Sequence, residues 1–555
     1  MINDIDMATA IYYSPDGFKV IGNKIMGRQV AGNSFLKAYF RYSDYKEFWV
    51  YSNKKAEAED FARFAREQGR NEKIKFINFQ NTGNLKEPGL LFYPGPSISL
   101  HAKRRSFYKD NSWSLCGITH TTSSGLAMDS ITDLITSPVQ SWDALICTST
   151  SVKKNVESLL ESQINYLKDR LGITKITLPK LPIIPLGIHT DEFLYTREQK
   201  SISRQKLGVN EETIVVLYTG RLSFHAKAHP MAMYRALEKA TNETKKEVVL
   251  IECGWHANDS IEKIFKQTAL ETCPSIRVVT LDGRKEENRN LAWASADIFC
   301  SLSDNIQETF GIVPIEAMAA GLPVVVSDWD GYKDSVRNGK EGFRIPTYMP
   351  EAGLGKDLAY RHGVGIDNYD MYCGLTCSLI SVDINATTKA FEKLFKSKDL
   401  REEMGNAGKK RAREKYDWKV IINQYEDLWS QQNEIRKKNS SSIKELKYPW
   451  PGRMDPFYSF ASYPTNIIKR ESKIRIMDQN IDQAIGRINT YKNNRMINFA
   501  KYIYPSQEEI TKLLKALGNQ TKSVGEIIDI FPENRKGYSM RTIGWLIKFG
   551  ILEIN

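Results

Sequence analysis

Short apolar runs rich in β-branched residues recur along the chain, and a helix-like segment follows each of them. This alternation predicts parallel, doubly wound sheets in an α/β protein. The first series of predicted strands comprises Ala8–Tyr13, Glu47–Tyr51, Leu90–Tyr93, Trp113–Thr119 and Ala144–Thr148. The second series comprises Thr213–Tyr218, Glu247–Glu252, Ile276–Leu281, Asp297–Ser301 and Pro323–Ser327.

A connector punctuated by prolines, Leu181–Ile188, separates the two series. We therefore expect two Rossmann-like doubly wound domains, residues 1–188 and 189–415, facing a cleft. Residues 416–438 are predicted to form a helix, because apolar residues of Asp417–Trp429 recur near a 3.6-residue period. Ligands of open α/β sheets bind beyond the carboxyl ends of strands, so we expect the functional site there.

The C-terminal part of the chain has a different pattern. Residues 439–505 begin with a polar break and continue with proline and aromatic residues, which predicts an irregular linker or extension. Residues 506–555 are predicted to form a small, mainly α domain, in which Gly550 stops the last helix and residues 551–554 form a strand. The three predicted helices are Ser506–Leu517, Ser523–Phe531 and Ser539–Phe549. This order resembles a winged helix-turn-helix.

The composition argues against a disordered, membrane-spanning, secreted or disulfide-rich protein. Hydrophobic residues make up 41% and charged residues 26% of the 555 positions, a balance that excludes wholesale disorder. The longest apolar stretches are far shorter than the roughly 20 residues of a membrane-spanning helix. The acidic start of the chain is unlike a secretory signal, and seven cysteines, few and odd in number, argue against a disulfide framework. We therefore expect a cytoplasmic protein. Cys373 and Cys377 lack a second ligand pair nearby, so no metal site is expected.

The net charge is +12, and residues 441–555 carry +7 of it. A basic tail permits an anionic partner, whether an anionic membrane at the inner membrane face, nucleic acid or a charged glycan, but a solvated basic face explains it equally well. The tail also suits contact with a protein partner or with a second copy of the chain. Arg535, Lys536, Arg541 and Lys548 would form only a modest footprint on DNA, which makes nucleic acid the less expected partner.

The segment Asp304–Val326 carries the most informative chemistry. It follows a predicted strand, and Gly311 would let the backbone approach a ligand closely. Pro314 suits the first turn of a helix, whose free N–H groups make an anion site. Glu308 and Glu316 bracket this loop, and carboxylates accept hydrogen bonds from sugar hydroxyls. One carboxylate on each side of a diphosphate cradle could hold a hexose and a ribose.

The segment Leu217–Pro230 supplies two cations. A predicted strand ends near Gly220, and Arg221 and Lys227 follow six residues apart. Arg offers a fork for phosphate and Lys a point charge, so together they could neutralise a departing diphosphate.

These residues resemble the signature of family 4 retaining glycosyltransferases. The likeness rests on Glu308-x7-Glu316 with its Phe-Gly and trailing Ala-Met-Ala-Ala-Gly-Leu-Pro-Val, on Gly220-Arg221-Leu222 with Lys227, and on the connector Pro185–Phe193. It covers about residues 8–430. The resemblance implies a GT-B fold, a nucleotide-sugar donor held mainly by the second domain, no metal requirement, and a tail helix that crosses back to the first domain.

The resemblance also implies roles for single residues. Arg221 and Lys227 would bind the donor diphosphate, Glu308 the donor-sugar hydroxyls, and Glu316 the ribose. His120 would lie at a strand end beside the donor sugar and count, with Glu308, Arg221 and Lys227, among the catalytic residues. Gly27 and Gly32 would belong to a glycine-containing loop after the first strand. The implied donor-binding residues are Gly27, Gly32, Arg221, Lys227, Gly283, Arg284, Glu308, Phe310, Gly311, Ile312 and Glu316.

The predicted activity is retaining transfer of a hexose from a nucleotide-diphosphate sugar, of the UDP or GDP type, to a glycan, lipid-linked or other hydroxyl acceptor, without a metal or other cofactor. A nucleic-acid-binding or regulatory protein with a sugar-nucleotide-sensing body is the alternative, and a related GT-B phosphorylase or epimerase is a third. The spacing from Arg221 to Lys227 and the absence of Lys-Gly depart from the family pattern. Residues 347–381 form an insertion that is either an acceptor lid or a decorated loop.

Overall fold

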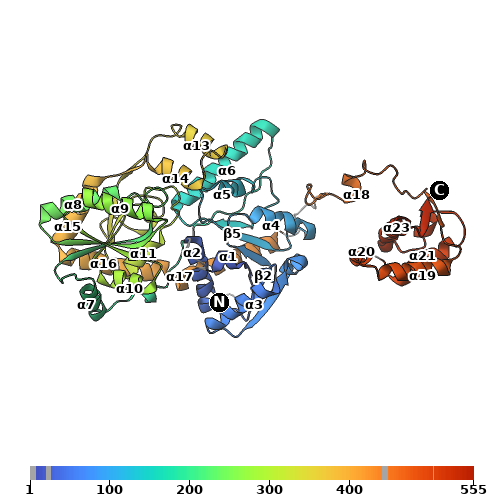
Figure 1. Cartoon of the computed structure of the whole chain (residues 1–555), viewed down its shortest axis with the longest axis horizontal. Helices are drawn as coiled ribbons and strands as arrows, with labels where there is room; N and C mark the ends of the chain where they lie inside the picture. Colours follow the sequence, from blue (N-terminus) through green and yellow to red (C-terminus); the bar gives the residue numbers. More distant parts are fainter. Residues whose placement is uncertain (1–7, 20–26, 440–447, 504, 555) are drawn as a thin grey trace. The chain divides into compact units, whose positions relative to one another are not determined.

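The computed structural model describes residues 8–19, 27–439, 448–503 and 505–554. The chain forms two compact units, Met1–Trp450 and Pro451–Asn555, each with its own apolar core. The larger unit contains two six-stranded sheets, with helices on both faces of each sheet (Figure 1). The sequence prediction of an α/β protein with two such sheets is confirmed.

The first sheet is entirely parallel and has the order β3-β2-β1-β4-β5-β6. Its strands are β1 (Ala10–Tyr12), β2 (Glu47–Ser52), β3 (Lys73–Asn78), β4 (Leu90–Tyr93), β5 (Ser114–Ile118) and β6 (Ala144–Ile146). The helices of this domain are α1 (Pro15–Phe18), α2 (Gly27–Tyr42), α3 (Lys55–Glu67), α4 (Ile98–Arg105), α5 (Gly125–Thr132) and α6 (Thr150–Leu171), with the 3-10 helices η1 (Phe79–Lys86) and η2 (Ser106–Tyr108).

The second sheet is also parallel and has the order β12-β11-β10-β7-β8-β9. Its strands are β7 (Ile214–Leu222), β8 (Val248–His256), β9 (Arg277–Asp282), β10 (Ile298–Ser301), β11 (Val324–Ser327) and β12 (Gly342–Ile345). Its helices are η3 (Thr190–Phe193), α7 (Arg197–Lys206), α8 (Met231–Thr244), α9 (Asp259–Thr272), α10 (Glu286–Ser295), α11 (Ile312–Ala319), α12 (Tyr332–Ser335), α15 (Ile384–Lys396), α16 (Lys398–Arg411) and η4 (Ala412–Tyr416). Two Rossmann-like sheets in one unit are the GT-B fold that the resemblance implies.

The ten predicted strands are present, and β3 and β12 lie outside those that the apolar runs predict. Both are edge strands with a single neighbour. In β3, Lys73 and Lys75 interrupt the apolar pattern, and β12 contains Arg344. Edge strands are less buried and tolerate charged side chains, so an apolar run is a poor signal for them.

The buried strands pack on both of their faces. In β4, the Leu90 and Phe92 side chains belong to one core cluster and the Leu91 side chain to another on the opposite face. Side chains alternate between the faces of a strand, so a strand covered on both sides must be apolar throughout. This double burial explains why continuous apolar runs mark the inner strands.

The chain crosses between the two domains twice, and the two crossings pair with each other. The Ile188 N–H donates to the Tyr416 carbonyl at 2.9 Å, and the Trp418 N–H donates to the Ile188 carbonyl at 3.0 Å. A Cβ on Gly187 would lie 2.5 Å from the Trp418 ring, so only glycine lets this indole pack against the connector. The connector and the return crossing are therefore held as one junction.

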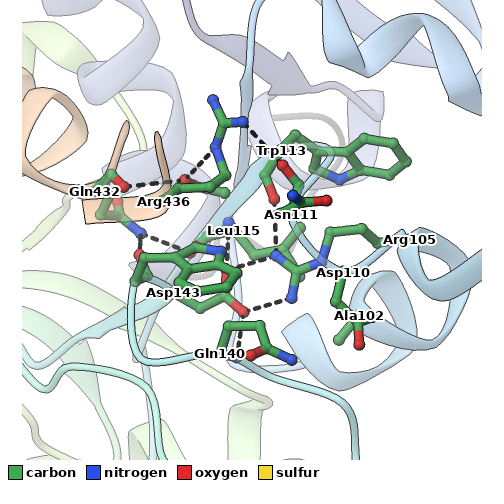
Figure 2. Close-up of polar contacts among 12 residues, drawn as sticks. Ala102, Arg105, Asp110, Asn111, Trp113, Leu115, Gln140, Asp143, Gln432 and Arg436 are labelled. Carbon is green, nitrogen blue, oxygen red and sulfur yellow. Dashed lines mark hydrogen bonds and ion pairs between the residues drawn. The ribbon is translucent and has the colours of Figure 1, made fainter. Parts of the chain in front are cut away.

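Helix α17 (Trp418–Lys438) begins at this junction and packs against the first domain, as the resemblance implies. The Gln432 amide donates to the Leu115 and Trp142 carbonyls at 2.8 and 2.9 Å. The Arg436 guanidinium donates to Ser114 Oγ and to the Asn111 carbonyl (Figure 2). These side chains attach the end of the helix to the start of β5 and the loops beside it.

A buried ion pair lies next to this attachment (Figure 2). The Arg105 guanidinium makes two hydrogen bonds of 2.7 Å to the Asp143 carboxylate, and both side chains are fully buried. Arg105 also donates to the Trp113 and Pro138 carbonyls, while Asp143 accepts from the backbone N–H of Leu115. A buried pair with all of these additional bonds orders the loops around β5 and β6.

The smaller unit corrects the prediction for residues 439–505. A strand, β15 (Lys473–Ile476), and a helix, α19 (Ile481–Lys492), lie within the expected linker, and Ile474, Ala484 and Ile488 are fully buried in the core of this unit. The neighbouring residues are rich in proline and aromatic residues, so the sequence predicted an irregular segment in place of this strand and helix. The remaining elements are α18 (Pro456–Ser459), α20 (Arg495–Asn498), η6 (Lys501–Ile503), α21 (Gln507–Leu517), β16 (Lys522–Ser523), α22 (Val524–Ile528), α23 (Glu533–Lys548) and β17 (Leu552–Ile554).

The three predicted C-terminal helices and the final strand are present, but their sheet depends on β15. This strand pairs antiparallel with both β16 and β17 and is the middle strand of three. The small domain is therefore larger than residues 506–555, because the strand that completes its sheet comes from before the helices.

None of the helices in the described residues is both long and apolar enough to cross a membrane. The seven cysteines are all buried and free.

The Asp143→Ala variant should lose about 3–5 kcal/mol of unfolding free energy, because it leaves the Arg105 guanidinium buried without its partner. Urea unfolding followed by tryptophan fluorescence measures this loss. Asp133→Ala is the matched control, since its partner Lys103 is half-exposed and such pairs contribute about 1 kcal/mol or less. Equal losses in the two variants would contradict the role given to the buried pair.

Candidate active site

The loop between β10 and α11 forms the centre of the candidate site. Gly311 precedes α11 with a φ of 80°, in the left-handed region that favours glycine. A Cβ at this position would lie 1.9 Å from Cε1 of Tyr332, whose hydroxyl is 2.9 Å from Ser301 Oγ. The Tyr332 ring therefore packs closely against the loop and links it to the end of β10, next to the free N–H groups at the start of α11.

Lys227 and Glu308 form an ion pair that joins two strand ends. The Lys227 ammonium lies 2.5 Å from Glu308 Oε2, and both side chains are largely buried. Burial alone would raise the pKa of Glu308, but the Lys227 charge and the backbone N–H groups of Thr309 and Phe310 hold it below its usual value. Glu308 is therefore a carboxylate at neutral pH, paired with Lys227 beyond the ends of β10 and β7.

Arg221 lies within β7, which continues to Leu222, past the predicted strand end at Tyr218. Its guanidinium donates to the Ala226 carbonyl, in the loop that carries Lys227. The two cations thus belong to one strand end and its following loop, which is an arrangement suited to a diphosphate.

Glu316 lies in α11, in surroundings unlike those of Glu308. Burial raises the pKa of Glu316 to about 7, with the Arg289 guanidinium opposing the rise and the Glu192 carboxylate adding to it. Around neutral pH a substantial fraction of Glu316 is protonated, and a protonated carboxyl both donates and accepts hydrogen bonds. The two glutamates that bracket the loop therefore differ in charge.

The first domain contacts this loop directly. Thr309 Oγ1 donates to the His120 carbonyl, at the end of β5, and Thr148 Oγ1 donates to the Thr309 carbonyl at 3.4 Å. The backbone of His120 therefore lies beside Glu308, and its side chain is half-buried. Phe310 is almost fully buried, so at this position only the backbone can serve a ligand.

Four predicted positions have other surroundings. Gly27 and Gly32 lie in α2 and not in a loop, and a Cβ on Gly32 would be 2.1 Å from the Gly17 carbonyl oxygen, so this glycine permits close packing of α2 on α1. The loop after the first strand falls on residues 20–26, outside the described residues. Arg284 makes a two-bond ion pair with Asp282 on the surface. It follows the edge strand β9, two strands from β7, and Gly283 there donates to the Gly254 carbonyl.

Two carboxylates of the second domain hold the start of α6, a contact that the sequence does not reveal. Ser149 Oγ donates to Asp330 Oδ1 at 2.9 Å, and the Thr150 N–H donates to Asp334 Oδ2 at 2.6 Å. The positive end of the helix dipole favours these carboxylates. Burial raises the pKa of Asp330 to about 7, although the Ser149 hydroxyl opposes the rise. The Asp-Gly pair after β11 marks a turn, but nothing in the sequence indicates its partner in the other domain.

The insertion of residues 347–381 lies between loops of both domains. It contains α13 (Lys356–Gly363) and α14 (Tyr369–Cys377), and its ends pair as β13 (Thr347–Tyr348) and β14 (Ser381–Val382). The Tyr369 hydroxyl is 3.4 Å from Thr121 Oγ1, next to His120. Cys377 Sγ is 3.9 Å from the His225 carbonyl, two residues before Lys227. These contacts place the insertion next to the candidate site.

The basic residues of α23 are largely engaged in contacts within their own unit. The Arg535 guanidinium makes two bonds of 2.6 and 2.7 Å to Glu509, and the Lys536 ammonium lies 3.2 Å from Asp529. Arg541 stacks 4.5 Å above the Tyr538 ring centroid. These pairs reduce the positive charge that the helix could offer to nucleic acid. Within the described part of the chain, no three His, Cys, Asp or Glu side chains are grouped as metal ligands.

Comparisons with known proteins agree with this geometry. Residues 199–355 match the family model described as "Glycosyl transferases group 1". An uncharacterized glycosyltransferase of Methanocaldococcus jannaschii is 26% identical over 208 residues, which are 37% of this chain and 48% of that protein. A D-inositol 3-phosphate glycosyltransferase of Corynebacterium efficiens is 29% identical over 149 residues, 27% of this chain and 34% of that protein. The chain thus spans less than half the length of each.

Among solved structures, HepE of Anabaena in complex with UDP is similar, with a TM-score of 0.47 and 15% sequence identity. The match covers 79% of this chain and 100% of that one.

A left-handed backbone conformation costs a residue with a Cβ about 1–2 kcal/mol. The Gly311→Ala variant should lose more unfolding free energy than this, because the Tyr332 ring must also move to make room for the Cβ. Gly321→Ala is the control. Its φ is 81°, but the nearest atom to its Cβ is at 3.1 Å, in the flexible Lys409 side chain. Thermal or urea unfolding gives both losses. A loss in Gly311→Ala no larger than in Gly321→Ala would contradict the role of Tyr332 in holding the loop.

When pH is raised from about 4.3 to 7, the unfolding free energy of the Glu316→Gln variant should fall less than that of the wild type. In this range folded Glu316 retains a proton that the unfolded chain has lost, so stability declines as pH rises. Glu308→Gln is the control of opposite sign, because the pKa of Glu308 is lower in the folded protein than in the unfolded chain. Ionised Glu308 therefore stabilises the fold above its unfolded pKa, and this stabilisation is lost as pH falls through its folded pKa. Urea titrations at several pH values test both signs, and parallel profiles for the wild type and Glu316→Gln would contradict the assignment.

Proposed function

We propose that the protein is a retaining glycosyltransferase that transfers a hexose from a nucleotide-diphosphate sugar, of the UDP or GDP type, without a metal ion. The observation that carries the proposal is the buried Lys227–Glu308 pair at the start of α11, against the His120 backbone of the other domain. A cation for phosphate and a carboxylate for sugar hydroxyls are thus side by side where the two domains meet. The match of residues 199–355 to a glycosyltransferase family model supports the same activity.

In this proposal the donor lies across the ends of β7 and β10. Arg221, Lys227 and the free N–H groups of α11 bind the diphosphate, and Glu308 accepts hydrogen bonds from the hexose. Glu316 binds the ribose, and Gly283 and Arg284 lie on the side of the base. His120 lies at the sugar from the first domain. This division agrees with the family 4 resemblance.

The reaction breaks the bond between the anomeric carbon and the diphosphate oxygen. Arg221, Lys227 and the α11 N-terminus stabilise the negative charge that develops on the leaving group. The acceptor oxygen bonds to the anomeric carbon on the same face, and its proton passes to the departing phosphate oxygen. Because the acceptor bonds to the face that the diphosphate leaves, the anomeric configuration is retained without a protein nucleophile. Contact between the two domains excludes water, which would otherwise hydrolyse the donor.

The acceptor is proposed to be a hydroxyl of a glycan or of a lipid-linked molecule. The insertion of residues 347–381 lies over the junction of the domains and is suited to act as an acceptor lid. Since the name of one relative specifies D-inositol 3-phosphate, this compound belongs in the first acceptor screen. A lipid-linked acceptor would bring the protein to the cytoplasmic face of a membrane.

Stabilisation by UDP, GDP and ADP, each with and without its common sugars, tests the donor. A nucleotide at ten times its Kd should add about 1.4 kcal/mol of stability. With the donor found, Lys227→Ala should lower kcat/KM by about 10²–10³, because it removes charge stabilisation of the leaving diphosphate. Lys266→Ala, on the exposed surface of α9, is the matched control. Near-normal turnover in a folded Lys227→Ala variant would refute the proposed role.

A further inference from the structure

Residues 454–463 and 496–503 of the smaller unit both expose several large apolar side chains, and the second segment lies in a stretch without acidic residues. The exposed fractions are 84% for Met496, 78% for Phe499, 88% for Tyr502 and 58% for Ile503. Single exposed apolar residues are common on protein surfaces, but four in eight residues mark a surface that contacts something else.

These side chains come from two short consecutive helical turns. Asn494 caps the short helix α20 through a hydrogen bond to the Met496 N–H, and η6 follows closely. Met496 lies in α20, Phe499 directly follows it, and Tyr502 and Ile503 lie in η6; the exposed side of these turns is the apolar face of the segment. Ile497 is 7% exposed and attaches the segment to its unit. The apolar face is therefore turned away from the core.

The charge pattern around this face identifies its partner. No Asp or Glu occurs from residue 483 to residue 507, whereas Arg487, Lys492, Arg495 and Lys501 do. Arg495 and Lys501 lie within the segment itself, and the Lys501 ammonium lies 5.7 Å from the centroid of the Tyr502 ring. Aromatic and aliphatic side chains bordered by Lys and Arg suit the boundary between lipid headgroups and acyl chains.

We propose that residues 494–503 form a docking surface for an anionic lipid membrane. Met496, Phe499, Tyr502 and Ile503 enter the headgroup boundary, and Arg495 and Lys501 contact lipid phosphates. Docking onto the remainder of the chain gains no charge complementarity, because residues 1–440 also carry a net charge of +5. Nucleic acid is disfavoured, since Phe499 and Tyr502 would have to stack on bases while Met496 and Ile503 stayed in water.

Co-sedimentation of the full chain with phosphatidylcholine vesicles, with and without phosphatidylglycerol, tests the proposal. Binding should require phosphatidylglycerol and weaken as salt is raised. The double variant Arg495→Gln/Lys501→Gln should bind about thirtyfold more weakly, from about 1 kcal/mol for each charge near an anionic surface. The triple variant Met496→Ser/Phe499→Ser/Tyr502→Ser should bind at least about tenfold more weakly, because its apolar area can no longer be buried. Both variants alter exposed side chains, so their thermal unfolding should match that of the wild type.

The matched control is Phe457→Ser/Tyr458→Ser/Tyr463→Ser, in the same unit. These aromatics are 72%, 70% and 79% exposed, but the nearby Arg453 is balanced by Asp455. The control should bind vesicles within twofold of the wild type. Failure of the full chain to bind anionic vesicles, or equal losses in the two triple variants, would overturn the proposal. The proposal would also be overturned if the full chain bound duplex DNA and the Met496→Ser/Phe499→Ser/Tyr502→Ser variant did not. Vesicle binding requires no glycosyl transfer, so its outcome is independent of the proposed activity.

Discussion

The pairing of the two domain crossings is the constraint on which the larger unit depends. Each domain could fold around its own sheet, but the hydrogen bonds between Ile188 and the backbone of Tyr416 and Trp418 determine where the domains meet. Trp418 packs on Gly187 and donates through its indole N–H to Ser34 Oγ at 2.7 Å. One apolar cluster consequently runs from the first sheet through α17 to the second sheet.

This junction has consequences for the chemistry. Anchoring of α17 by Gln432 and Arg436 keeps β5 in position, and the His120 backbone that contacts Thr309 follows the end of β5 by two residues. The start of α6 adds a second attachment through Asp330 and Asp334. The site at the ends of β7 and β10 is thus completed by the first domain. Its two glutamates acquire different charges, because Glu308 has a lysine partner and Glu316 is mainly desolvated.

Local patterns predicted much of this arrangement. Inner strands are buried on both faces and must be apolar throughout, so their runs are visible in the sequence, whereas the edge strands β3 and β12 carry charges and are not. Arg221, Lys227, Glu308 and Gly311 could be selected because their residue types and spacing follow predicted strands. The small unit was less predictable, since β15 is separated from the strands that it joins by more than forty residues of mixed composition.

The sequence by itself determined the two parallel sheets and the connector between them, because these depend on local periodicity, and it supplied the residues proposed to bind phosphate and sugar, through side-chain chemistry and the family resemblance. Only the tertiary structure decided that Lys227 pairs with Glu308, that Glu316 has a pKa near 7, and that Asp330 receives a hydrogen bond from Ser149. It also placed Gly32 in a packed helix. Such contacts join residues distant in the chain, and their energies depend on burial and on partners that no local pattern specifies.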